Sequence, residues 1–203
     1  MIVAGILLAG GLSRRMGGGD KCLRRLGSTT ILARVIARAA PQVGMLALNA
    51  NRDPARFADY RLPVIADSIP DFAGPLAGVL AGLDWAAATS NDVTHVASFP
   101  TDAPFLPTDL VARLRTALAG DAADLACAAS GGRAHPVVAL WPVALRDELR
   151  RAMQNDGIRK VDAWTARYRL ALVDYAAAPI DPFFNTNRPD DLEVAERLLA
   201  GDI

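Results

Sequence analysis

The sequence has few of the residues that mark disulfide-rich, metal-chelating or membrane proteins. Of its 203 residues only two are cysteine, Cys22 and Cys127, which lie far apart and in no C-x-x-C arrangement. A disulfide framework and a zinc site are therefore disfavoured. The apolar segment that starts at Ile2 has no positive stretch before it, and Gly10 and Gly11 interrupt it well short of a membrane span. We expect a cytoplasmic protein with no signal peptide and no membrane partner.

The chain also lacks a surplus of charge of either sign. Its 22 lysine and arginine residues balance 22 aspartate and glutamate residues. Because proteins that bind nucleic acids usually carry a basic surplus, we expect no nucleic-acid partner. Within the neutral chain, residues 11–30 hold five cations against one acid, and residues 181–203 hold six acids against two cations. Positive charge confined to one segment suits a small phosphorylated ligand.

Short apolar segments rich in Val, Ile and Leu alternate with longer segments of helical period. This alternation predicts an α/β fold of three layers. A mainly parallel, Rossmann-like sheet would form the middle layer, with helices on both of its faces. With no repeat or linker, we expect a single domain over residues 1–203. The predicted strands cover residues 2–8, 43–49, 63–66, 93–99, 124–129, 136–140 and 170–174. The predicted helices cover residues 31–39, 75–85, 107–118, 145–153, 161–167 and 192–199.

The segment after the first predicted strand is rich in glycine and in positive charge. Residues 10–21 include five glycines and three cations, among them Arg15 and Lys21. The segment fits neither G-x-G-x-x-G nor the P-loop pattern, because Asp20 precedes Lys21 and Cys22 follows it. Backbone N–H groups and cations after a strand suit a polyphosphate. The alternative is a surface turn with solvated arginines, but Lys21, one of only two lysines, favours phosphate binding.

Polar side chains stand where three predicted strands end. Asp102 follows the strand at residues 93–99, and Asn49 and Asp67 stand at the ends of the second and third strands. Carboxyl ends of parallel strands meet at one edge of a sheet, where ligands bind. A carboxylate that faces a polyphosphate there is a natural ligand for Mg²⁺. Asp102 taken alone is better explained as a cap of the following turn, and it is the polar residues at the neighbouring strand ends that favour a ligand site.

The remaining reactive side chains give weaker signals. His95 is expected to be a structural residue inside a strand, whereas His135, expected in a loop, is the better candidate for touching substrate. Cys22, beside Lys21, is a candidate reactive thiolate. With no evident general base, the sequence favours a reaction whose nucleophile is already ionised. Transfer of a nucleotidyl group to a phosphate is such a reaction.

In combination, these motifs resemble the molybdenum cofactor guanylyltransferases, the MobA family. The resemblance runs in order along nearly the whole chain. It is carried by Leu8-Ala9-Gly10-Gly11, Arg15-Met16-Gly17-Gly18, Asp20-Lys21, Asn49-Ala50-Asn51-Arg52, Asp67-Ser68, Gly74-Pro75-Leu76-Ala77-Gly78, Pro100-Thr101-Asp102-Ala103-Pro104-Phe105, His135-Pro136 and Asn185-Thr186-Asn187-Arg188-Pro189. It implies a fold of the nucleotidyltransferase type and the transfer of GMP from GTP to molybdopterin that carries molybdenum, with release of pyrophosphate.

The resemblance also implies site residues, Mg²⁺ as cofactor, and contact with other proteins of cofactor synthesis. The backbone would contact the nucleotide, polar side chains would hold the nucleoside, and charged side chains would act in catalysis. The backbone contacts would come from Leu8, Ala9 and Gly10, and the polar side chains would be those of Asn49 and Asp67. The charged side chains would be those of Arg15, Lys21 and Asp102. Lys21 and Asp102 would also bind the nucleotide, and Asp102 would bind Mg²⁺. His135 and residues 185–187 would lie toward the pterin or the catalytic centre.

Three alternatives remain open at the level of sequence. A cytidylyltransferase that acts on the same pterin and a sugar-phosphate nucleotidyltransferase would share the fold and the glycine-rich opening. Gly10 and Gly11 after Leu8 and Ala9 favour the guanylyl reading. A non-catalytic nucleotide-binding carrier of the cofactor is disfavoured, because a pure binder has less need of a metal carboxylate aimed at phosphates.

Overall fold

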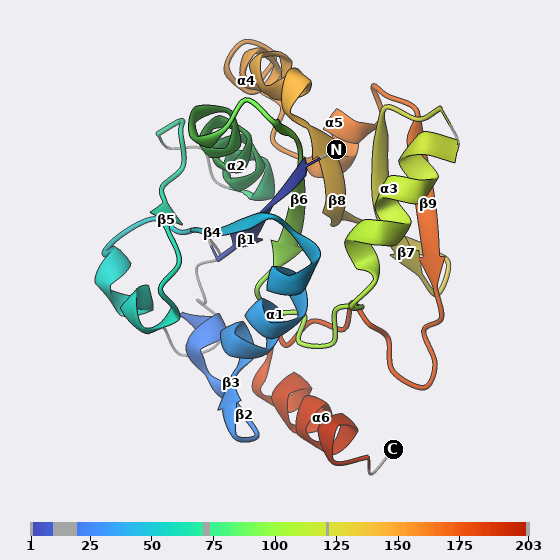
Figure 1. The fold of residues 1–203 in the computed structure, drawn as a ribbon. Helices are drawn as coiled ribbons and strands as arrows, with labels where there is room; N and C mark the ends of the chain where they lie inside the picture. Colours follow the sequence, from blue (N-terminus) through green and yellow to red (C-terminus); the bar gives the residue numbers. More distant parts are fainter. Residues whose placement is uncertain (1, 10–19, 71–73, 121, 202–203) are drawn as a thin grey trace.

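A seven-stranded sheet runs through the centre of the computed structural model, which describes residues 2–9, 20–70, 74–120 and 122–201 (Figure 1). The strand order is β5-β4-β1-β6-β8-β7-β9. The strands are β1 Ile2–Leu8, β4 Met45–Asn49, β5 Val64–Ile65, β6 Val93–Pro100, β7 Leu125–Ser130, β8 Arg133–Pro142 and β9 Leu170–Tyr175. All pairs are parallel except those of β8, which runs antiparallel to β6 and β7. The prediction of a mainly parallel sheet is confirmed.

Helices cover both faces of this sheet (Figure 1). They are α1 Ile31–Ala39, α2 Pro75–Thr89, α3 Leu110–Gly120, α4 Arg146–Gln154, α5 Val161–Thr165 and α6 Pro189–Ala200. α2, α4 and α5 pack on one face, and α1 and α3 pack on the other. Among the described residues no helix is long and apolar enough to cross a membrane, and α2, the longest, has 15 residues. The three-layer α/β arrangement is thus the predicted one.

The central strand β1 shows why the sheet needs helices on both sides. Ala4 and Ile6 point into the core under α2, whereas Val3 and Leu7 point into the core under α1 and α3. Successive side chains of a strand alternate between faces, so a strand covered on both faces is apolar throughout. This produces the unbroken apolar run at the start of the sequence.

Several local features differ from the predicted elements. A short hairpin, β2 Arg25–Leu26 and β3 Thr29–Thr30, and a 3₁₀ segment, η4 Pro54–Tyr60, were not predicted. The prediction that His135 lies in a loop is wrong, because β8 already begins at Arg133. Gly131 and Gly132 form the whole turn between β7 and β8, both with positive φ (54° and 75°), and pairing resumes directly after them. Such two-residue turns need residues that tolerate positive φ.

Candidate active site

Strands β1, β4 and β6 end side by side at one edge of the sheet. Leu8, the last residue of β1, pairs with Asn49, the last residue of β4. The N–H group of Ala9 donates to the carbonyl of Asn49 at 2.9 Å, and the hydroxyl of Thr101 donates to the carbonyl of Leu8 at 3.0 Å. The strand ends predicted to lie together are therefore joined by hydrogen bonds.

Lys21 and Asp102 form an ion pair at this edge. The Lys21 ammonium lies 2.7 Å from Oδ2 of Asp102, and the two side chains are 17% and 22% exposed. Lys21 belongs to a short 3₁₀ turn, η2 Lys21–Leu23, which follows the glycine-rich segment. The charges predicted to act together are thus in direct contact, in a site only partly open to water, where screening is weaker than at a free surface.

Asn187 is a third member of this cluster. The Lys21 ammonium also donates to Oδ1 of Asn187, so a carboxylate and an amide oxygen share one cation. Thr186, which is fully buried, donates to the carbonyl of Asp102 through its N–H group at 2.9 Å and its hydroxyl at 3.1 Å. The Asp191 carboxylate accepts from the Asn187 N–H group at 2.8 Å, so the start of α6 fixes this segment. The resemblance places residues 185–187 toward the pterin or the catalytic centre, but Asn187 was missing from the predicted catalytic set.

A second cluster lies at the ends of β4 and β5. The amide of Asn49 donates to Oδ1 of Asp67, and the amide of Asn51 donates to Oδ2, both at 2.8 Å. Asn49 is 3% exposed and also donates to the carbonyl of Ile65 at 3.1 Å. The oxygen of its amide faces Gly78 in α2 so closely that a Cβ at that position would overlap it. The structure brings Asn49 and Asp67 together as predicted and adds Asn51.

Arg56 connects the glycine-rich segment to this second cluster. It lies in η4, which the sequence did not predict, and its guanidinium lies 2.9 Å from the Asp20 carboxylate. The same side chain donates to the carbonyl of Asn51. No motif singled out Arg56, because its contacts depend on a 3₁₀ segment with no apolar period. A further cation thereby stands near the predicted phosphate loop.

The prediction of a reactive thiolate at Cys22 is wrong. The side chain is 3% exposed, and burial, followed by the nearby charge of Asp20, raises the pKa of its thiol to about 11. A thiol of that pKa is protonated at neutral pH and is a poor nucleophile.

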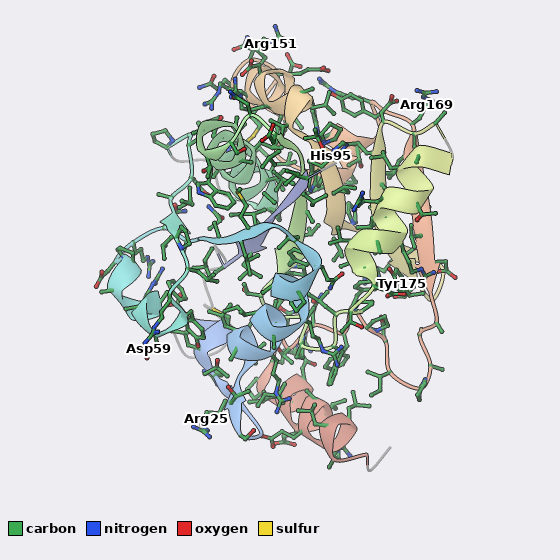
Figure 2. All side chains as sticks on the ribbon, in the orientation of Figure 1. Arg25, Asp59, His95, Arg151, Arg169 and Tyr175 are labelled. Atoms are coloured by element: carbon green, nitrogen blue, oxygen red, sulfur yellow. The ribbon has the colours of Figure 1, made fainter. Side chains whose placement is uncertain are left out.

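A polar network lies at the end of β7, next to β8. The Ser130 hydroxyl contacts Nε2 of His135 at 2.8 Å and donates to Oδ1 of Asp181 at 2.9 Å. His95 lies near the start of β6, at the end of the sheet opposite to Ser130. Figure 2 labels both His95 and Tyr175, and Tyr175 is the last residue of β9, at the same end of the sheet as Ser130. Burial lowers the pKa of both histidines. His135 is therefore on the site's side of the molecule, and His95 is not.

Two of the predicted site residues, Gly10 and Arg15, lie outside the described residues. Within the described ranges, no group of three or more histidine, cysteine, aspartate or glutamate side chains could hold a metal ion on its own. Mg²⁺ is commonly held by one or two carboxylates together with substrate phosphate oxygens and water.

This arrangement is that of the nucleotidyltransferase-type α/β proteins. The crystal structure of molybdopterin-guanine dinucleotide biosynthesis protein A from Archaeoglobus fulgidus superposes with a TM-score of 0.76, at 23% identity, over 98% of this chain and 99% of that one. Rv0371c from Mycobacterium tuberculosis H37Rv, solved in complex with manganese, gives a TM-score of 0.68 at 17% identity, over 97% of this chain and 99% of that one.

Sequence comparison specifies the family. Residues 5–170 match the family described as the MobA-like NTP transferase domain. A molybdenum cofactor guanylyltransferase of Rhodopseudomonas palustris (strain HaA2) is 61% identical over 193 residues, which cover 95% of this chain and 90% of that protein. The chain belongs to the MobA-like NTP transferases, in the group of the molybdenum cofactor guanylyltransferases.

Proposed function

We propose that this chain transfers GMP from GTP to the terminal phosphate of molybdenum-bearing molybdopterin and releases pyrophosphate. The contact between Lys21 and Asp102 carries the proposal, because it places a cation suited to phosphate oxygens beside a carboxylate suited to a metal ion at one strand edge. The names of the relatives, at identities up to 61%, support guanylyl transfer over cytidylyl transfer.

The triphosphate would lie at the end of β1. Lys21 would bind its oxygens in exchange for part of its contact with Asp102, with help from Arg15 and from the backbone of Leu8, Ala9 and Gly10. A lysine ammonium is a compact charge that suits a phosphate oxygen. The proposal therefore gives Lys21 two alternative anionic partners, the carboxylate and the nucleotide.

The nucleoside would lie toward β4 and β5. Asn49 uses its amide hydrogens on Asp67 and on a backbone carbonyl, so it would act by holding Asp67. The Asp67 carboxylate accepts one amide on each oxygen, and each oxygen has a further lone pair. Those lone pairs suit the hydroxyl or N–H donors of a guanosine.

Asp102 would hold Mg²⁺. The side-chain oxygens of Asp102 and Asn187 both contact the Lys21 ammonium. Such hard oxygen atoms fit Mg²⁺ better than a metal that prefers sulfur or imidazole ligands. Substrate phosphate oxygens and water would complete the coordination. When bound, the metal would neutralise charge that builds up on the phosphates.

The chemistry needs no general base from the protein. A terminal phosphate oxygen of the pterin, already ionised at neutral pH, attacks the α-phosphorus of GTP. A new P–O bond forms to that oxygen, the bond from the α-phosphorus to the bridging α,β-oxygen breaks, and the electron pair leaves on pyrophosphate. The protein's contribution is positioning and positive charge, which together can supply most of the rate enhancement.

We also propose that residues 1–203 form one domain that works in the cytoplasm, alongside other proteins of cofactor synthesis. The segment at residues 181–191 supports the first point, since it contacts the site from the C-terminal part of the chain. Two free buried cysteines, Cys22 and Cys127, suit a reducing compartment.

The test is pyrophosphate release with Mg²⁺, molybdenum-loaded molybdopterin and either GTP or CTP. GTP should support turnover, and Asp102→Ala should lose most of it. Asp92→Ala is the matched control, because Asp92 is exposed and lies just before the start of the same strand. A preference for CTP would overturn the guanylyl assignment, and unchanged turnover in Asp102→Ala would overturn the role of that carboxylate.

A further inference from the structure

The hydrogen bonds around Ser130 determine which nitrogen of His135 carries the proton. Asp181, as a carboxylate, can only accept, and Ser130 donates its single hydroxyl hydrogen to it at 2.9 Å. The contact of 2.8 Å between the Ser130 oxygen and Nε2 of His135 must then be donated by the imidazole. Neutral His135 is thereby held as the Nε2–H tautomer, which leaves the lone pair on Nδ1.

The neutral form of His135 is favoured by its surroundings. Burial lowers the pKa of His135, with Arg133 adding to the effect and Asp181 opposing it. The ring also packs on Phe183 with a centroid distance of 4.7 Å, which fixes its plane. The N–H group of Phe183 donates to the same Asp181 oxygen at 2.9 Å. Nδ1 of His135 is thus an acceptor of fixed direction, and the described residues provide no hydrogen bond to it.

His135 lies at the part of the sheet edge where the second substrate, rather than GTP, would bind. The proposed nucleoside cluster lies at β4 and β5, and Lys21 meets Asp102 at the ends of β1 and β6. His135 lies in β8, on the other side of β6. The segment at residues 181–187 contacts both places, since Asp181 binds Ser130 and Thr186 binds Asp102. GTP would therefore occupy one half of the edge and leave the β8 half for the acceptor.

We propose that Nδ1 of His135 binds the acceptor substrate by accepting an N–H or O–H group of its pterin moiety, and that Ser130 and Asp181 are positioning residues that hold the required tautomer. This inference rests on the proposed function for the nature of the second substrate. The tautomer itself follows from the hydrogen bonds alone. No proton moves in this step, because the imidazole only accepts a hydrogen bond.

The tautomer can be measured without turnover by ¹⁵N NMR of the imidazole nitrogens. The chain has two histidines, so a His95→Gln variant assigns both spectra. At pH 7.5, His135 should show a protonated Nε2 and an unprotonated Nδ1. Ser130→Ala should relax this preference, and Ser130→Thr, which keeps the hydroxyl, should restore it. A protonated Nδ1 in the wild-type protein would overturn the inference.

Two substitutions of His135 separate substrate binding from a structural role. Gln reaches the position of Nε2 and can still donate to Ser130, whereas Asn places its amide oxygen near the position of Nδ1. We expect His135→Gln to raise the KM for molybdopterin about fivefold, the loss expected for one hydrogen bond, and His135→Asn to raise it less. The KM for GTP should be unchanged in both. The reverse order, with Asn worse than Gln, would indicate a structural bridge to Ser130 and overturn the inference.

Addition of molybdopterin to the wild-type protein is the closing experiment. The ¹⁵N resonance of Nδ1 should shift on binding, while that of His95 should not. If the wild-type protein transfers GMP but the Nδ1 resonance does not respond to molybdopterin, the inference fails and the proposed function stands. If the resonance responds and no GMP is transferred, the proposed function fails and the binding role of His135 stands.

Discussion

The Lys21 ammonium lies 2.7 Å from the Asp102 carboxylate, although 81 residues separate them in the chain. One follows the glycine-rich segment after β1, and the other follows β6, the strand beside β1 in the sheet. Parallel pairing of two neighbouring strands therefore brings a cation and a carboxylate to the same edge. Each charge stabilises the other, and under the proposed function phosphates and a metal ion would replace part of the contact.

Replacement of Lys21 should affect turnover far more than folding. We expect Lys21→Ala to lower kcat/KM for GTP by about 100-fold, the usual effect of losing one preorganised charge at a transferring phosphate. The control is Lys160→Ala, because Lys160 is the only other lysine and lies exposed before α5. Steady-state pyrophosphate release measures both. Equal activities of the two variants would contradict the role given to Lys21.

A methyl group at Gly78 should disturb the nucleoside cluster. Its Cβ would overlap the amide oxygen of Asn49 and lie 2.7 Å from Cδ2 of Leu8, so Asn49 must move and its hydrogen bond to Asp67 must weaken. We expect Gly78→Ala to raise the KM for GTP about tenfold. Gly120→Ala is the matched control, since its Cβ would meet nothing within 4 Å. An unchanged KM in Gly78→Ala would show that Asn49 does not set GTP affinity.

The two cysteines should resist alkylation in the folded protein. Burial raises the pKa of both thiols, Cys22 and Cys127, to about 11, so little thiolate exists at pH 8 and reagents have little access to it. Iodoacetamide at pH 8 should label neither thiol in the native protein and both after denaturation, as counted by mass spectrometry. Rapid native labelling of Cys22 would contradict its burial.

Stability should fall as the pH is lowered from neutral. The folded-state pKa values of His95 and His135 lie below 6.5, because burial disfavours their charged forms. The unfolded chain then takes up protons first, so the free energy of unfolding decreases from about pH 6.5 down to the folded pKa values and is insensitive to these groups above pH 7.5. Urea unfolding at pH 7.5 and 5.5 measures this change.

A variant with both histidines replaced by glutamine should lose that part of the pH dependence. Asp124 and Asp147, whose pKa values are lowered by hydrogen bonds from arginine, titrate in a more acidic range and do not affect the comparison. A wild-type protein that becomes more stable between pH 7.5 and 5.5 would contradict the lowered histidine pKa values.

The sequence predicts the sheet well because its central strands are buried on both faces. The run from Ile2 to Leu8 and the helical period from Ile31 to Ala39 are direct consequences of that burial, and both elements have the predicted bounds. Thr30 caps α1, its hydroxyl accepting from the Ala33 N–H group at 3.1 Å. The β2–β3 hairpin was not predicted, since neither Arg25–Leu26 nor Thr29–Thr30 forms an apolar run like that of the equally short β5.

Site residues at strand ends were predictable from the residues themselves, whereas those brought in by tertiary contact were not, and only the family resemblance placed residues 185–187 toward the catalytic centre. Asp102 and Asp67 follow apolar strands, and strand order places them at one edge. Asn187 contacts Lys21 although 166 positions separate them in the chain. Arg56 contacts Asp20 because a 3₁₀ segment holds the two side chains together. Neither contact is a property of local sequence. His135 lies on the site's side of the sheet but was assigned to the wrong element, and its contact with substrate stays a prediction.

The most direct test of the account is mass spectrometry of the pterin product made by the wild-type protein with Mg²⁺, GTP and molybdenum-loaded molybdopterin. We predict a product that has gained one GMP unit, together with an equal amount of pyrophosphate. A pterin that gains CMP from CTP but nothing from GTP, or that stays unchanged while GTP is consumed, would contradict guanylyl transfer by this chain.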